Sequence, residues 1–130
     1  QMTKTAIKPD GMTAVGPYSL GIEAGGFIHF SGQVPLDQAT GKLVEGDIQV
    51  QTRQALENLK RVMAAAGVGF EDVVKCVVFL TDMGNFAAVN EVYAEYMVEP
   101  FPARSCVQVA GLPLGSQVEI EAIAVAVAKG

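Results

Sequence analysis

The chain has 130 residues, of which 50% are hydrophobic and 18% are charged, and its formal net charge is −5 at pH 7. This is the length of one domain, so we treat residues 1–130 as a single domain. The acidic balance disfavours nucleic-acid and membrane-surface partners, which need a basic face, while the apolar content exceeds what one small domain buries and predicts an oligomer.

The N-terminus begins with Gln1 before Met2, and we expect Met2 to be the natural start. No apolar segment follows Lys4 and Lys8, so a secretory signal is not predicted. The best apolar run, Ala122–Ala128, is shorter than the roughly 18 residues of a membrane span. These features together predict a cytoplasmic protein with no membrane partner.

The first predicted elements are two strands and the turn between them. Alternation of apolar residues predicts strands over Tyr18–Ala24 and Phe27–Gln33, and Gly25-Gly26 between them is typical of a hairpin turn. Residues 37–46 are polar and contain a glycine, which predicts a loop.

A long helix and a strand are predicted next. Asp47 is placed to cap a helix that begins at Ile48, and Gly67 is placed to end it. The run Val73–Leu80 is nearly all apolar and rich in β-branched residues, which predicts a strand buried on both faces.

A second helix is predicted from the helical spacing of apolar residues over Phe86–Met97. Either Asn85 or Asp82 is its expected cap, and Pro100 and Pro102 are expected to close it.

Two further strands, Ala103–Ala110 and Val118–Ala128, complete the predicted order. Strands, helix, strand, helix and two strands predict an α+β fold, with one mixed sheet and two helices on one of its faces. In the last strand one side is wholly apolar, whereas the other carries Glu119 and Glu121. We predict that the helices cover the apolar side, and that Arg104, Cys106 and Glu119 share the other face, which a partner chain covers.

Few residues suggest chemistry by themselves. Arg104 is suited to a bidentate grip on a small carboxylate, but a salt bridge to Glu119 or Glu121 explains it as well. Glu119 or Glu121 is a candidate general base if burial raises the pKa of its carboxyl. Cys106 is a candidate nucleophile or a packed thiol, and we favour the packed thiol.

The remaining candidates are equally ambiguous. Tyr18 is either a core aromatic or a polar contact to a ligand, and Ser31-Gly32 is either a plain turn or a close backbone approach to a ligand. His29 is expected to be packed among apolar neighbours. With one histidine and no CxxC pair, no metal site is expected, and Cys76 and Cys106 are typical of reduced thiols.

Several motifs, however, occur in a characteristic order. They are Ser31–Pro35 with Thr40-Gly41, Asn85–Asn90 with Tyr93, Phe101–Val107, and Val118–Ala122. In these motifs, and over nearly the whole chain from Gly16 onward, the sequence resembles the Rid family, also called YjgF or the reactive intermediate deaminases. The Pro-Ala-Arg-Ser-Cys stretch at 102–106 is the most specific of these motifs.

The resemblance implies a chorismate-mutase-like fold and a homotrimer whose sheets face inward, with clefts between neighbouring subunits. It implies the activity of a 2-iminobutanoate/2-iminopropanoate deaminase, which hydrolyses the imine tautomers of 2-aminoacrylate and 2-aminocrotonate to 2-oxo acids and ammonia. The expected partners are thus small 2-imino and 2-oxo acids, and no cofactor or metal is expected.

The resemblance also implies roles for particular residues. Arg104 would clamp the substrate carboxylate, and Glu119, in preference to Glu121, would orient or deprotonate a water. The other implied site residues are Cys106 and Tyr18, which would line the pocket, and Ser31, Gly32 and Asn90, which would help bind the substrate.

Two alternatives stay open. A non-catalytic module that binds small carboxylates would need Arg104 as well. An endoribonuclease is the second alternative, which the acidic chain and the single histidine disfavour. The weakly charged turn Leu114-Gly115-Ser116 leaves the size of the substrate open.

Overall fold

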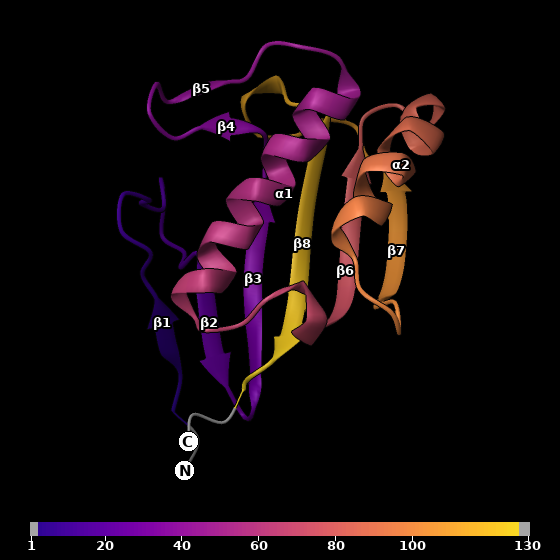
Figure 1. Cartoon of the computed structure of the whole chain (residues 1–130). Coiled ribbons are helices and arrows are strands. Elements are labelled where there is room, and N and C mark those ends of the chain that lie inside the picture. The colour runs from indigo at the N-terminus through magenta and orange to yellow at the C-terminus, as the bar shows by residue number, and fades with distance from the viewer. Residues whose placement is uncertain (1–2, 128–130) are drawn as a thin grey trace.

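The computed structural model describes residues 3–127 as one six-stranded sheet with two helices on one face (Figure 1). In spatial order the strands are β1 (Thr5–Ile7), β2 (Gly21–Ala24), β3 (Phe27–Gln33), β8 (Val118–Val125), β6 (Val73–Leu80) and β7 (Ala103–Gln108). All neighbouring strands are antiparallel except β6 and β7, which are parallel and joined through a helix. The predicted mixed α+β architecture is confirmed. The last strand ends at Val125 and not at Ala128 as predicted, since Ala126 and Val127 no longer belong to the sheet. The predicted start at Met2 lies outside the described residues.

Both helices form where predicted. α1 (Ile48–Ala65) is capped by Asp47, whose carboxylate accepts a hydrogen bond of 2.9 Å from the Val50 amide, and Gly67 follows its end with a φ of +75°. Asn85 is the N-cap residue of α2 (Phe86–Tyr96), but its side chain makes no cap hydrogen bond.

The expectations about the ends of α2 need correction. Asp82 caps a separate 3-10 turn (Met83–Asn85) that precedes the helix, because its carboxylate accepts from the Gly84 amide. α2 also ends at Tyr96, well before Pro100, so the prolines do not stop it.

Short exposed strands were missed or misplaced. Residues 37–46, predicted as a loop, contribute to a small hairpin of β4 (Leu36–Asp37) and β5 (Lys42–Leu43), and β1 was not predicted at all. β2 begins at Gly21 rather than Tyr18, and β7 ends at Gln108 rather than Ala110. Such short strands carry too few buried residues for an apolar alternation to mark them.

The hydrophobic core lies between the helices and one face of the sheet. It contains the buried side chains Ile28, Phe30, Leu56, Leu59, Val78, Leu80 and Ile120. The prediction that β6 is buried on both faces is wrong for the single chain. Cys76 and Val78 face the helices and are buried, whereas Val77 and Phe79 on the opposite face are only half-buried.

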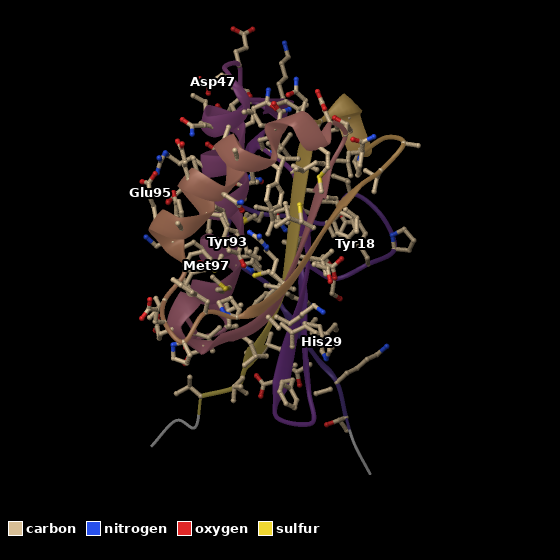
Figure 2. The ribbon with its side chains drawn as sticks, turned by 90° about the vertical axis from the view of Figure 1, so that its right-hand side faces the viewer. Tyr18, His29, Asp47, Tyr93, Glu95 and Met97 are labelled. Carbon is tan, nitrogen blue, oxygen red and sulfur yellow. The ribbon has the colours of Figure 1, made fainter. Side chains whose placement is uncertain are left out.

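That opposite face, which we call the open face, is covered by no helix. Figure 2 shows both helices on one side of the sheet and Tyr18 and His29 on the other. His29 is exposed there, not packed as predicted. The apolar residues of the open face are Phe27, Val77, Phe79, Val107, Ile123 and Val125.

One buried amide connects α1 to the chain after β3. Asn58, 3% exposed, donates hydrogen bonds from Nδ2 to the carbonyls of Val34 (3.1 Å) and Leu36 (2.8 Å). We expect Asn58→Ala to lower the free energy of unfolding by about 2–4 kcal/mol, because it leaves both carbonyls without this partner. Urea denaturation measures the change.

Gln54→Ala is the matched control. It removes only the bond from Gln54 Nε2 to Asn58 Oδ1, so its cost should be about 1 kcal/mol or less. Equal losses in the two variants would contradict the role given to Asn58.

Candidate active site

Arg104 lies on the edge strand β7 and packs against one face of α2. Its guanidinium carbon is 4.8 Å from the centre of the Tyr93 ring and 5.4 Å from that of Phe86, and Nη1 donates a 2.7 Å hydrogen bond to Asn90 Oδ1. These three α2 residues follow at intervals of four and three, which places them on one helix face. Two aromatic rings and one amide thus fix the direction of the guanidinium.

The charge of Arg104 is not neutralised within the described chain. Among residues 3–127 the one salt bridge joins Arg53 to Glu95, so the predicted alternative of a pair between Arg104 and Glu119 or Glu121 is not formed within one chain. The side chain is exposed and borders a pocket of about 430 Å³, which we call the arginine pocket. The pocket is lined by Asn90, Tyr93, Ala94, Met97, Phe101, Pro102 and Arg104. An oriented, unpaired guanidinium at a pocket is suited to bind a small carboxylate.

The prediction that Arg104 and Cys106 share a face with Glu119 is wrong. Strand pairing aligns Arg104 with Cys76 and Ala122, whose side chains face the helices, whereas Glu119 is aligned with Phe79 on the open face. Arg104 and Glu119 therefore point to opposite sides of the sheet, from strands separated by about 10 Å.

Glu119 lies at a second pocket, of about 380 Å³, which we call the glutamate pocket. Tyr18, Gly32 and Leu114 line it as well. Glu119 is half-buried, and burial raises the pKa of its carboxyl, with a further increase from the nearby charge of Glu121. A carboxylate with a raised pKa is a better proton acceptor near neutral pH than an ordinary one.

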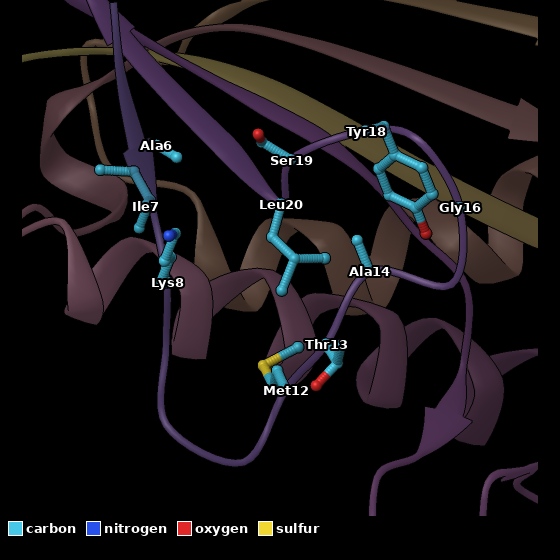
Figure 3. Close-up of a pocket in the computed structure, with 10 residues that line it drawn as sticks. All are labelled: Ala6, Ile7, Lys8, Met12, Thr13, Ala14, Gly16, Tyr18, Ser19 and Leu20. Atoms are coloured by element: carbon cyan, nitrogen blue, oxygen red, sulfur yellow. The ribbon is translucent and has the colours of Figure 1, made fainter.

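Ser31 and Tyr18 lie in the same region, but the Ser31 hydroxyl is engaged in a hydrogen bond within the chain and the Tyr18 hydroxyl is not. Ser31 Oγ donates a 2.6 Å hydrogen bond to the Ser19 carbonyl, and the Ser31 amide donates to Leu20, so Ser31 holds the segment that carries Tyr18. Tyr18 is 48% exposed and lies between the glutamate pocket and a neighbouring pocket near the N-terminus (Figure 3). Its hydroxyl makes no hydrogen bond to the rest of the described chain.

Cys106 lies two residues along β7 from Arg104 and is half-buried. Burial raises the pKa of the Cys106 thiol, and the charge of Arg104 only partly opposes this. The group is therefore a thiol at neutral pH, which fits packing better than nucleophilic attack.

Gly32 is required by the close approach of Glu119. A Cβ at position 32 would lie 2.7 Å from Glu119 Cδ and 2.8 Å from its Cγ. We expect Gly32→Ala to lower kcat about 10- to 100-fold, because the carboxylate must move away from its place. Stability should change little, since the displaced group is the end of a flexible side chain.

Gly111→Ala is the control for Gly32→Ala, because a Cβ there would meet no atom within 4 Å. Its activity should match that of the wild type in a steady-state assay of the deaminase reaction that the family resemblance implies. If Gly32→Ala is equally active, Glu119 does not need its present position.

Sequence reasoning missed two site residues, Phe86 and Tyr93. Both belong to the apolar pattern that predicts the second helix, but their rings also hold the Arg104 guanidinium. Their helical spacing with Asn90 was the available signal, although nothing in it indicated that Arg104 lies opposite.

Within residues 3–127 no group of three His, Cys, Asp or Glu side chains could hold a metal ion, and no helix there is long and apolar enough to cross a membrane.

The comparisons with known proteins agree with this fold. Residues 9–126 match the family model described as Endoribonuclease L-PSP. Protein DfrA of Myxococcus xanthus is 51% identical over 96% of this chain and 98% of its own length. The 2-iminobutanoate/2-iminopropanoate deaminase of Salmonella typhimurium is 46% identical over 95% and 98%, respectively. The solved structure of Escherichia coli TdcF with bound serine has a TM-score of 0.86 and 42% identity, covering 93% of this chain and 98% of that one.

One mixed sheet with two helices on a single face, and this degree of likeness, define a small α+β protein of the L-PSP type. The chain belongs to the Rid family, as its sequence motifs suggested.

Proposed function

We propose that the protein hydrolyses 2-imino acids, the tautomers of 2-aminoacrylate and 2-aminocrotonate, to 2-oxo acids and ammonia. The observation that carries the proposal is Arg104, a guanidinium oriented by Phe86, Tyr93 and Asn90 that has no ion-pair partner in the described chain. Relatives named as deaminases of such imines, and a relative solved with serine, support a substrate that carries an amino-acid carboxylate.

In this proposal, a complete site needs two copies of the chain. Arg104 and Glu119 lie on opposite faces of one sheet, so one copy would supply the arginine pocket and its neighbour the glutamate pocket. The uncovered apolar residues of the open face would be buried by association. We propose the homotrimer with inward-facing sheets and a chorismate-mutase-like arrangement, with the sites in the clefts between subunits.

The proposed chemistry is a hydrolysis. Arg104 would bind the substrate carboxylate. The Glu119 carboxylate of the neighbouring copy would take a proton from a water molecule while the oxygen of that water attacks the iminium carbon. The C–O bond forms as the C=N π electrons return to nitrogen, giving a carbinolamine. Protonation of that nitrogen, loss of ammonia and closure of the C=O bond release the 2-oxo acid. Cys106, Tyr18, Ser31 and Gly32 would shape the pocket without a covalent step.

Complementation tests the shared site. Arg104→Ala and Glu119→Gln proteins should each be nearly inactive toward an imine that a serine or threonine dehydratase generates in the assay. When the two variants are unfolded, mixed and refolded together, a fraction of their interfaces holds an intact Arg104 and an intact Glu119, so part of the activity should return. If properly assembled mixtures regain no activity, Arg104 of one copy does not act together with Glu119 of its neighbour, and the shared site is refuted.

The same assay separates the alternatives. A binding module would bind 2-oxobutanoate without accelerating imine loss. An endoribonuclease would degrade RNA, which the net charge of −5 and the single His29 do not favour.

A cytoplasmic location is proposed from the two free cysteines, although one relative, mmf1 of Schizosaccharomyces pombe, is described as mitochondrial.

A further inference from the structure

One wall of the glutamate pocket is apolar, and the smallest 2-imino acids have no side chain large enough to contact it. The pocket also has polar lining residues, Thr13, Gln33 and Gln38, but much of its lining is aliphatic: Val15, Leu20, Val34, Leu36, Pro113 and Leu114. Its volume of about 380 Å³ falls in the range of sites that bind small molecules, roughly 300–1,000 Å³. A substrate with a methyl side chain would leave most of that space to water.

Leu114 lines this pocket and is unfavourable there in two respects, its backbone conformation and the exposure of its side chain. Its φ is +60°, a conformation that a leucine adopts at a cost and that glycine adopts freely. Its side chain is also 67% exposed in the single chain. An apolar group of a ligand that covers the side chain would remove this exposed area from water.

Val15 provides a second exposed aliphatic side chain at the same pocket. It belongs to the segment before β2, far from Leu114 in the sequence, and it is 90% exposed. Two unrelated segments thus present bare aliphatic groups beside the carboxylate that the proposed reaction uses.

We propose that this wall selects 2-imino acids with a branched aliphatic side chain, such as the imine derived from leucine, and that Leu114 is the residue that sets the preference. The inference rests on the proposed function, because Arg104 and Glu119 fix which end of the substrate enters the wall.

The test compares two imines generated by one amino-acid oxidase, from alanine and from leucine. For the wild type we expect kcat/KM for the leucine-derived imine to be at least about tenfold higher, the discrimination that a few buried methylenes supply. Leu114→Lys should lower that ratio about tenfold. Val50→Lys, at a site on α1 that is 47% exposed, is the control and should leave the ratio unchanged.

A binding experiment separates this inference from the proposed function. Titration calorimetry with 4-methyl-2-oxopentanoate and pyruvate should show preference for the branched acid, lost in Leu114→Lys, even if the protein catalyses nothing. Activity toward both imines with an unchanged ratio in Leu114→Lys would overturn the inference and leave the proposed function standing. A changed oligomeric mass of Leu114→Lys in light scattering would also overturn it, because Leu114 would then be a contact between copies.

Discussion

Replacing Arg104 with alanine is expected to lower kcat/KM for 2-imino acids by about 30- to 4,000-fold. Truncating one member of a charge-assisted pair costs about 2–5 kcal/mol, and each 1.4 kcal/mol is a factor of ten. Arg104→Lys should recover only part of the loss, because an ammonium keeps the charge but not the planar two-point geometry. Coupled assays of 2-oxo acid release measure both variants.

The fold should survive these changes, because Arg104 is exposed and makes no salt bridge within residues 3–127. Arg53→Ala is the matched control. Arg53 is also an exposed arginine over a tyrosine ring, 5.9 Å from the centre of Tyr96, but it is paired with Glu95 on the outer side of the helices. Comparable losses in Arg53→Ala and Arg104→Ala would show that activity responds to general damage and not to the arginine pocket.

Replacing Glu119 with glutamine should lower kcat by about 10²- to 10⁴-fold, the usual contribution of a general base. Glu121→Gln is the control, because Glu121 lies on the same face but does not line the glutamate pocket.

In the wild type, activity should fall on the acidic side as Glu119 becomes protonated, at a pH above the ordinary carboxyl range. Glu121→Gln should move this limb to lower pH, because it removes the charge that helps raise the pKa of Glu119.

Stability should respond in the opposite sense to activity. The pKa of Glu119 is higher in the folded chain than in the unfolded chain, so the proton is bound more tightly when the chain is folded. The resulting stabilisation is present below the unfolded pKa and is lost as pH rises through the folded pKa. Glu119→Gln should therefore raise Tm relative to wild type above neutral pH, and the gain should shrink on acidification. A Tm difference that does not vary with pH would contradict the burial of this charge.

Local chemistry was enough to predict several elements. The hairpin at Gly25-Gly26, where both residues have positive φ, and the strand Phe27–Gln33 are confirmed. The cap at Asp47 and the helix that it begins are also confirmed. Each depends on a few neighbouring residues, so the sequence of the segment is sufficient.

The faces of the edge strand β7 were not predictable in that way. β8 has one wholly apolar side, which identifies the side that the helices cover. β7 is largely exposed, with Arg104, Cys106 and Gln108 on one side and Ser105 and Val107 on the other. Because neither side is clearly apolar, the sequence does not indicate which side faces the helices. The register of β7 with β6 shows that Arg104 faces α2.

Motifs and local periodicity are enough to predict the family, the order of the two helices and the longer strands, and the candidate site residues, but not the short strands β1, β4 and β5. Two contacts follow from the three-dimensional arrangement and not from the local sequence. Arg104 contacts Phe86, Asn90 and Tyr93, whereas Glu119 contacts Gly32 on the opposite face of the sheet. The physical reason is that successive strand residues alternate between faces, so a single step in strand register moves a side chain across the sheet.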